Sequence, residues 1–433
     1  MHRRIKLLPL SILVSSLMLS SCGLFNDDDL SIYNSFNPVS SESEEDPDAV
    51  KAGGVVAKEI PEVPNAYCFK SICYATDDKI TNTYKEGGAN YHEYNVNNGE
   101  DFPGSDSRTN YDLYVPHSTP RNDEHLAILF IHGGAWVSGF KTDVKEFVYE
   151  YANRGYVTAT IKYTLLKESM NDPSLSIFRN LDEIDACIAS IKSVLGELGF
   201  DTTKTKLAIG GASSGSHLTM LYSYSRGHNS PIPIKFLVDA VGPVDIKPEN
   251  WKMFKHATDE VLDGGITASA IQTQDDASNL YKLPIADSDK DTTRFWTPFE
   301  TMRIANGMCG LPYPLEQIEE TADENRDAIA NPNVASDSMT KPGGGEDLLS
   351  VTYWIGQTTN RYPIVCAYGG KDSIVGIAQY AKLETALDNY SIPHRFVYFR
   401  DSDHTQIGKT FNETKYNEFL SYVNAWCEAE TIS

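Results

Sequence analysis

The sequence predicts an α/β fold in which a mostly parallel central sheet carries helices on both faces. Apolar runs of strand length at 126–131 and 234–241 are continuous, as is typical of strands buried on both faces. Segments with helical spacing separate such runs, and this alternation predicts right-handed crossovers between parallel strands. Glycine-rich segments at 132–136 and 210–215 directly follow two of the runs. Sheets of this kind hold their active sites beyond the carboxyl ends of the strands, so these two segments are the first candidates for a site.

The predicted elements of the first half follow one another in a regular order. Residues 111–116 alternate and end at a proline, as a strand does, and the buried run 126–131 follows. Residues 143–153 have helical spacing and are closed by a glycine. Residues 156–163 are rich in β-branched side chains and predict a strand. Residues 176–198 predict a long amphipathic helix, because large aliphatic side chains recur on one face.

The alternation is interrupted once. A strand at 206–209 leads into the second glycine-rich segment and a helix that begins near residue 216, and the strand at 234–241 follows. Residues 246–361 then lack a clear rhythm and predict an insertion, which either caps the site or lies at the periphery. The alternation resumes with a strand, a helix, a strand and a closing helix at 362–368, 377–390, 395–399 and 412–428.

The N-terminus predicts export and anchorage. In residues 1–22 a short basic region precedes an apolar run of about a dozen residues, which is too short to span a bilayer comfortably. The run ends in Leu-Ser-Ser-Cys-Gly, which resembles the bacterial lipobox. Cys22 is therefore expected to carry lipid and to anchor the protein outside the cytoplasm, at a bacterial membrane or the cell surface. An ordinary signal peptide with a chance cysteine is the alternative. Residues 23–64 predict an acidic, disordered tether, and residues 65–433 one folded domain.

Net charge and cysteine spacing bear on nucleic-acid binding, disulfides and metal sites. A formal net charge of −23 argues against a nucleic-acid partner, because nothing offsets the repulsion by phosphates. Cys68 and Cys73 lie close together in a segment predicted to be irregular, and an extracytoplasmic location would allow a disulfide between them. Cys187 and Cys366 fall in apolar stretches and are expected to be packed thiols. No C-x-x-C pair or H-E-x-x-H motif occurs, so no zinc site is expected. No feature of the sequence indicates an oligomeric state.

Residues 211–215 carry the strongest signal of chemistry. They read Gly-Ala-Ser-Ser-Gly and match the pattern G-x-S-x-G between a predicted strand and a predicted helix. A nucleophilic serine needs a tight, strained turn in that context to lift its hydroxyl above the sheet. The pattern therefore predicts Ser213 as a nucleophile, although a glycine- and serine-rich turn without catalytic meaning fits it equally well in isolation.

The late loops supply the partners that a nucleophilic serine needs, a base and an acid that orients the base. Asp372 is the only carboxylate in the loop after the next-to-last predicted strand, and His404 is the only histidine after the last one. We therefore expect Asp372 to orient His404, and His404 to take the proton of Ser213. Asp401 and Asp403 are alternative acids, which their position beside the histidine disfavours.

Backbone donors for an oxyanion are expected on two segments. The N–H group of Ser214, at the start of the helix, is one candidate. The N–H groups of Gly134 and Ala135, in the loop after strand 126–131, are the others. His132 is expected to brace this loop. Trp136 either lines the pocket or packs in the interior.

Together these motifs resemble the α/β-hydrolase esterases with an H-G-G-x-W oxyanion loop, a group that includes carboxylesterase-like, acetyl-esterase-like and BD-FAE-type feruloyl esterase enzymes. The motifs that carry the resemblance occur in family order: His132-Gly133-Gly134-Ala135-Trp136, the segment 210–218, Gly242-Pro243-Val244-Asp245, the loop of Asp372, and His404. The resemblance covers about 110–245 and 350–427. It implies an α/β-hydrolase fold and ester hydrolysis through an acyl-enzyme, without a metal or cofactor. Three sites depart from the family pattern: Tyr368 replaces the usual histidine, 401–403 replaces the usual glycines, and Ser214 stands where alanine or glycine is common.

The expected function is that of a serine carboxylic-ester hydrolase acting on small acyl esters or glycan-linked esters. Two alternatives remain at this point. The same three side chains would serve an amidase, a peptidase or an arylformamidase-like enzyme, since the H-G-G-x-W loop also resembles that of kynurenine formamidases. The other alternative is a non-catalytic binding protein on a hydrolase fold.

Overall fold

A computed structural model describes the residues that build the predicted sheet and its helices. The described residues are 49–74, 109–136, 139–165, 177–245, 349–372, 374–408 and 410–432, together with the backbone of a short hairpin of β9 (Pro284–Asp287) and β10 (Thr292–Phe295). The predicted lipidation site Cys22 and most of the predicted insertion lie outside this part of the chain. Within it, no helix is both long enough and apolar enough to cross a membrane.

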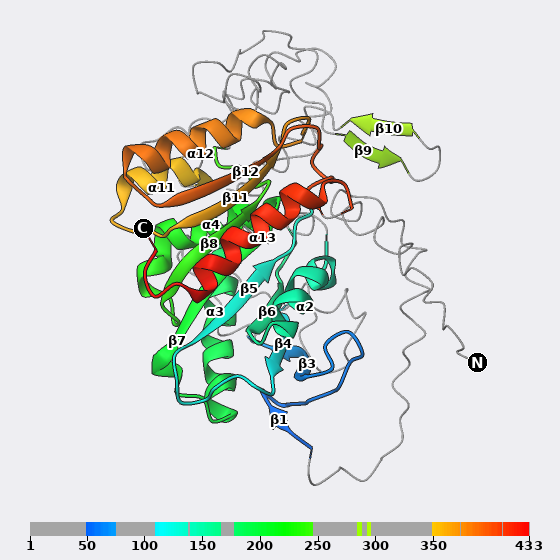
Figure 1. Cartoon of the computed structure of the whole chain (residues 1–433), viewed down its shortest axis with the longest axis vertical. Coiled ribbons are helices and arrows are strands. Elements are labelled where there is room, and N and C mark those ends of the chain that lie inside the picture. The colour runs from blue at the N-terminus through cyan, green and yellow to red at the C-terminus, as the bar shows by residue number, and fades with distance from the viewer. Residues whose placement is uncertain are drawn as a thin grey trace, which may run out of the picture.

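The core of the molecule is an eight-stranded sheet in the order β12-β11-β8-β7-β5-β6-β4-β3 (Figure 1). Every pair from β12 to β6 is parallel, and β4 is antiparallel to both of its neighbours. The prediction of an α/β fold with a mostly parallel sheet is therefore confirmed. The strands are β3 (Ala66–Cys73), β4 (Asn110–Pro116), β5 (His125–Ile131), β6 (Val157–Lys162), β7 (Thr205–Ala212), β8 (Ile234–Ala240), β11 (Ile364–Gly369) and β12 (His394–Phe399).

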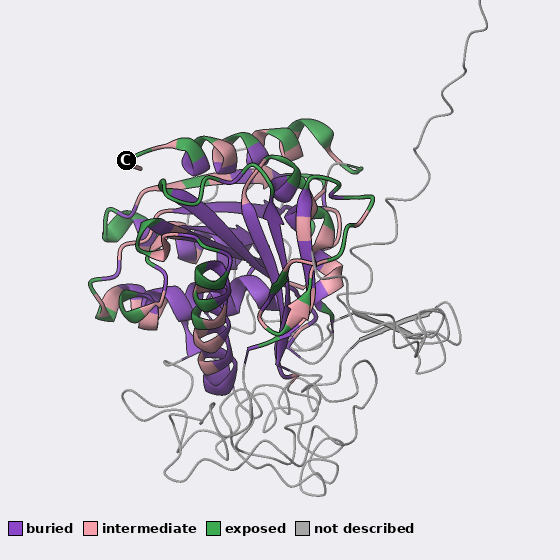
Figure 2. Ribbon diagram, turned by 90° about the horizontal axis from the view of Figure 1, so that it is seen from below, coloured by how far each residue is buried: buried purple, intermediate pink, exposed green. Residues whose placement is uncertain are grey.

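Helices cover both faces of the sheet. On one face lie α2 (Lys145–Asn153), which continues the short 3-10 helix η3 (Lys141–Val144), and α13 (Glu413–Glu428). The other face carries α3 (Ile177–Glu197), α4 (Ser214–Arg226), α11 (Val351–Gln357) and α12 (Ile377–Asn389). Figure 2 shows the result: the strands between the two helical layers are buried, and the exposed residues lie on the outer sides of the helices and in the connecting loops. The continuous apolar runs of the sequence have this cause, because both faces of each central strand are covered.

The folded part begins earlier in the chain than predicted. A hairpin of β1 (Lys51–Ala52) and β2 (Val55–Val56) precedes β3, and Ala52 and Val63 are buried. The tether predicted over 23–64 therefore extends too far, since its last part packs onto the domain. The acidic, serine-rich composition that suggested disorder ends before residue 49.

The segment that holds Cys68 and Cys73 is also ordered, contrary to the prediction. Both residues lie on β3, where they pair with Tyr114 and Asn110 of β4. Five positions along a strand span about 16 Å, whereas a disulfide needs Cα atoms within about 7 Å. A disulfide between Cys68 and Cys73 is therefore excluded in this fold. The strand was missed because a bulge between Phe69 and Ile72 breaks its alternation.

The predicted insertion is shorter than expected, because α11 lies within its predicted range of 246–361. This helix packs against α4 and α12. The residues that flank the insertion meet each other: Val351 N–H donates to Val244 O at 2.8 Å, and Ser350 Oγ donates to Asp245 Oδ1 at 3.1 Å. The described core of the α/β fold thus resumes at residue 349. That the insertion caps the site stays a prediction.

Candidate active site

Ser213 lies at the turn between β7 and α4, in the middle of the sheet. Its backbone has φ 53° and ψ −121°, a left-handed conformation that a residue with a side chain adopts only under strain. The turn is fixed by a neighbouring strand, because Ser213 N–H donates to Ala240 O at the end of β8 at 2.7 Å. The local geometry is that of the strained strand-to-helix turn which presents a serine above a sheet.

His404 connects Ser213 to Asp372. Its Nε2 atom lies 2.9 Å from Ser213 Oγ, and its Nδ1 atom lies 2.7 Å from Asp372 Oδ2. All three side chains are buried. The other carboxylate oxygen, Asp372 Oδ1, accepts the N–H groups of Ile374 at 2.8 Å and Val375 at 2.7 Å. These bonds aim the free oxygen at the imidazole, so the structure brings together the three side chains that the sequence predicted as a triad.

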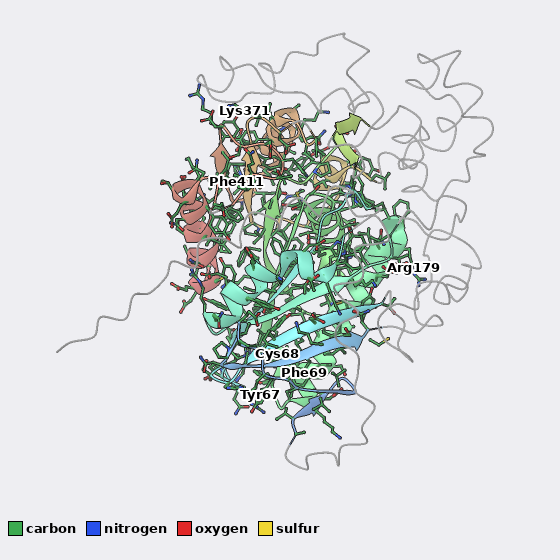
Figure 3. The ribbon with its side chains drawn as sticks, turned by 90° about the vertical axis from the view of Figure 1, so that its right-hand side faces the viewer. Tyr67, Cys68, Phe69, Arg179, Lys371 and Phe411 are labelled. Carbon is green, nitrogen blue, oxygen red and sulfur yellow. The ribbon has the colours of Figure 1, made fainter. Side chains whose placement is uncertain are left out.

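The two competing acids point elsewhere. Asp401 is exposed and forms a surface ion pair with Lys371 at 3.2 Å. Asp403 Oδ1 accepts from the backbone N–H of Thr405 at 2.8 Å and from its hydroxyl at 2.9 Å. Figure 3 shows Lys371, the neighbour of Asp372, near one end of the molecule, and the edge strand β3 with Tyr67 near the other. Of these three carboxylates, only that of Asp372 forms a hydrogen bond with the ring of His404.

The loop after β5, which holds the predicted oxyanion donors, has an unusual backbone. Gly134, Ala135 and Trp136 have φ values of 114°, 52° and 64° in succession. Positive φ is uncommon for residues with a side chain, and two of them in a row indicate a loop held by its surroundings. Part of that hold is contact with the turn of Ser213: a Cβ on Gly133 would lie 2.9 Å from Ala212 O and 3.1 Å from the Cβ of Ser213. The loop therefore lies directly against Ser213, and its glycine permits this approach.

The first turn of α4 meets the same loop from the other side. Ser214 is the first residue of α4, so its N–H group has no carbonyl partner within the helix. A Cβ on Gly215 would overlap the carbonyl oxygens of Ile131 and His132. Glycine at this position thus lets the helix start in contact with the end of β5. The three predicted donor residues, Gly134, Ala135 and Ser214, lie on two segments in direct contact; their role as donors stays a prediction.

His132 and His217 are both structural in position, as expected. His132 is buried, its Nδ1–H donates to Gly133 O at 2.7 Å, and burial lowers its pKa to about 4. His217 Nε2–H donates to Leu349 O at 2.8 Å, and burial lowers its pKa to about 4 as well. Both rings are therefore neutral at physiological pH. Trp136 is buried with its ring edge-on to His217, at 5.3 Å between centroids. Trp136 thus packs in the interior, and whether it also lines a pocket stays a prediction.

A buried ion cluster beyond the loop that follows β5 was not predicted. Lys141, in η3, lies 2.8 Å from Asp112 Oδ1, and Lys70 lies 3.1 Å from Oδ2. Lys141 also donates to Ser71 Oγ at 2.7 Å. Burial alone would raise the pKa of Asp112, but the two lysines outweigh it and hold that pKa below its ordinary value. The cluster joins β3, β4 and the loop, and ion pairs between such distant segments leave no pattern in the sequence.

Tyr368, which departs from the family pattern, supports the turn after β8. Its hydroxyl donates to Gly242 O at 2.6 Å, and Gly242 N–H donates to Asp239 Oδ1 at 2.8 Å. Asp239 is fully buried, and this burial raises its pKa to about 6. Among the described residues, no three His, Cys, Asp or Glu side chains gather in a way that could hold a metal ion.

The chain is similar to one protein family model and to several solved structures. Residues 111–282 match the family model BD-FAE. No curated protein sequence matches the chain at a significant level. Among solved structures, esterase B from Lactobacillus rhamnosis HN001 is 13% identical with a TM-score of 0.49, over 86% of this chain and 89% of that one. A truncated carbohydrate esterase from gut microbiota is 14% identical with a TM-score of 0.49, over 86% and 99%. A bifunctional GH43-CE protein from Bacteroides eggerthii is 15% identical with a TM-score of 0.45, over 84% and 39%.

The matched segment has a definite place in the site. It spans β4 to β8, contains the loop after β5 and Ser213, and ends before Asp372 and His404. The last two residues are therefore located by the geometry alone. Residues 111–282 of this α/β fold, which include Ser213, thus match the BD-FAE family model.

Proposed function

We propose that this protein is a serine carboxylic-ester hydrolase that works through an acyl-enzyme. The observation that carries the proposal is the position of His404, which is within hydrogen-bond distance of both Ser213 Oγ, at 2.9 Å, and Asp372 Oδ2, at 2.7 Å. Ser213 Oγ attacks the ester carbonyl while His404 Nε2 takes its proton, and Asp372 stabilises the imidazolium that forms. His404 then returns the proton to the departing alcohol, and water hydrolyses the acyl-enzyme by the same steps.

We assign stabilisation of the negative charge on the tetrahedral intermediate to backbone donors. These donors are the N–H groups of Gly134, Ala135 and Ser214, which lie on the loop after β5 and at the start of α4. Donors that are oriented before the reaction lower the barrier because they need not reorganise when the charge develops. The strained φ values of Ala135 and Trp136 support a loop that is held in one conformation for this purpose.

The substrates we propose are small acyl esters or glycan-linked esters, such as acetylated or feruloylated glycans. The BD-FAE match over 111–282 favours this class. So does the predicted lipid anchor at Cys22, since an enzyme tethered outside the cytoplasm meets ester-bearing polymers and their fragments. We propose that location as well: substitution Cys22→Ala should abolish incorporation of labelled fatty acid and release the protein from the membrane fraction.

The decisive experiment is labelling with a fluorophosphonate probe together with hydrolysis of p-nitrophenyl acetate. Wild-type protein should be labelled and active, and Ser213→Ala should lose both properties. Ser225→Ala is a matched control, because Ser225 lies on the same helix and its hydroxyl donates only to Leu221 O one turn earlier. An unlabelled, inactive wild type would overturn the proposal and favour a binding protein. A labelled enzyme that prefers amide or formamide substrates would favour the amidase or arylformamidase alternative.

A further inference from the structure

Tyr163 lies between the two segments to which we assign the oxyanion donors. It directly follows β6 and is buried. Its hydroxyl donates to His132 O at 3.3 Å, at the start of the loop after β5. The same hydroxyl oxygen lies 3.5 Å from Ser214 Oγ, on the first residue of α4. One side chain thus reaches the loop and the helix start together.

The ring of Tyr163 adds a second contact with the loop. It stacks on the imidazole of His132, with 4.4 Å between centroids and 13° between planes. His132 is neutral, since burial lowers its pKa, so this contact is a stack of two uncharged rings. Stacked aromatic pairs attract each other beyond the effect of the area that they bury. Ring and hydroxyl therefore hold the same residue of the loop in two directions.

The direction of the hydrogen bonds follows from the atoms involved. His132 O can only accept, so the single hydrogen of Tyr163 is directed at it. The Tyr163 oxygen keeps a lone pair that can accept the Ser214 hydroxyl at the longer distance. Burial raises the pKa of Tyr163 above its ordinary value, so the hydroxyl keeps its hydrogen at any working pH. The hydrogen bonds therefore run from the Ser214 hydroxyl to the Tyr163 hydroxyl, and from the Tyr163 hydroxyl to His132 O.

Tyr163 is itself fixed from behind by α3. The next residue, Thr164, donates its N–H to Glu183 Oε2 at 2.8 Å, and its carbonyl accepts from Asn180 Nδ2 at 2.8 Å. Glu183 is fully buried and paired with the buried Arg179 at 3.3 Å. A buried residue with such support cannot move far from its position.

From these contacts we infer that Tyr163 is a positioning residue for the reaction: it holds the loop after β5 and the first turn of α4 in the relative placement that oxyanion binding requires. The inference rests on the proposed function. It also gives a role to Ser214, which stands where alanine or glycine is common in the family that the sequence resembles. In this chain the extra hydroxyl completes the contact between the two segments.

Tyr163→Phe is the variant that tests this inference, because it keeps the stacked ring and removes only the hydroxyl. Tyr224→Phe is the matched control: Tyr224 is also fully buried and donates to a backbone carbonyl, that of Tyr362 at 3.0 Å, near the opposite end of α4. Both variants lose one buried hydrogen bond, so the midpoint of urea denaturation should fall to a similar extent in the two. Only Tyr163→Phe should lower kcat.

The readouts separate positioning from a merely structural role. Removal of one oxyanion donor costs about 10²–10³ in kcat, and a displaced donor retains part of its effect, so kcat should fall by about 10-fold in Tyr163→Phe while KM stays unchanged. Affinity for a boronic acid, which forms a tetrahedral adduct with the serine, should fall with kcat. Ser214→Ala should lower kcat in the wild type and add little in the Tyr163→Phe background, because the partner hydroxyl is already gone.

The outcomes distinguish this inference from the proposed function. An active, probe-labelled wild type whose Tyr163→Phe variant keeps its kcat would overturn the inference alone. Equal losses of kcat in Tyr163→Phe and Tyr224→Phe would overturn it as well, and so would fully additive effects of Tyr163→Phe and Ser214→Ala on kcat. If Tyr163→Phe fails to fold, Ser214→Ala decides by itself: a wild-type kcat overturns the inference. A wild type that neither reacts with the probe nor hydrolyses esters overturns the proposed function and this inference with it.

Discussion

Asp372 Oδ2 lies 2.7 Å from Nδ1 of His404, although 32 residues separate the two in the chain. They meet because β11 and β12 are parallel neighbours, so the loops that follow them emerge side by side. Asp372→Asn should therefore lower kcat by about 10³–10⁴-fold, because an amide in that place favours the wrong imidazole tautomer. Steady-state kinetics on p-nitrophenyl acetate measures the effect.

The control for this prediction is Asp403→Asn. Asp403 adjoins His404 in sequence, but its carboxylate accepts from Thr405, and an asparagine oxygen can accept the same bonds. We expect this variant to keep wild-type kcat. The opposite order of effects would assign the acid to Asp403 and contradict the geometry.

Glycine at 215 should be essential for activity for a steric reason. A Cβ there would overlap the carbonyl oxygens of Ile131 and His132, so Gly215→Ala must push α4 away from the oxyanion loop. A shift of about 1 Å at such a site can cost on the order of 100-fold in rate. We expect a loss of kcat on that scale.

Gly196→Ala provides the comparison for Gly215→Ala. Gly196 lies within α3, where a Cβ would have Thr202 Cγ2 as its nearest neighbour at 3.9 Å. Alanine there should raise stability by about 0.4–1 kcal/mol through the unfolded state, with activity unchanged. Similar activities of the two variants would show that the close approach at Gly215 does not matter.

Most of the fold could be predicted from the sequence, because its central strands are buried on both faces and read as continuous apolar runs. Ser213, Asp372 and His404 could be nominated from the same pattern, since each lies in the turn or loop that follows a predicted strand. Where the pattern is broken, prediction failed: the bulge in β3 hides a strand that alternates only in part. The seven-residue helix α11 is too short to show a helical period.

The contacts that hold the site together could not be read from the sequence. Lys141 and Asp112 are paired only because β4, β6 and η3 come together in the folded sheet. Tyr163 touches His132 and Ser214 because β6 is the neighbour of β5, and β5 is the neighbour of β7. Strand order decides both cases, and local patterns carry no information about strand order. Tyr163 did offer one signal, its position at the carboxyl end of a parallel strand.

Asp239 predicts a pH dependence of stability. Burial raises its pKa to about 6 from its ordinary value of 3.8, so between these pH values the folded state binds more protons than the unfolded state. Stability must therefore fall as pH rises through this window, by at most about 3 kcal/mol from this group. Asp239→Asn resembles the protonated acid, and its oxygen can still accept from Gly242 N–H.

Urea denaturation at several pH values measures this dependence. The stability of Asp239→Asn relative to the wild type should increase as pH rises from about 4 to 7, in line with the protons that Asp239 releases. A difference that stays constant across this range would mean that Asp239 does not titrate there.

The early start of the folded domain predicts the outcome of an N-terminal truncation. A protein that begins at residue 65 lacks the buried side chains of Ala52 and Val63 and the bond from Gly53 N–H to Glu197 Oε2 at 2.8 Å. Exposing the surface that one buried valine covers costs about 1.5–3 kcal/mol, so this protein should unfold at lower urea than one that begins at residue 49. The control begins at residue 23 and should match the 49 start, because residues 23–48 are acidic and poor in apolar side chains. If the proteins that begin at residues 49 and 65 were equally stable, the domain would begin at residue 65, as predicted. The strands β1 and β2 would then not contribute to stability.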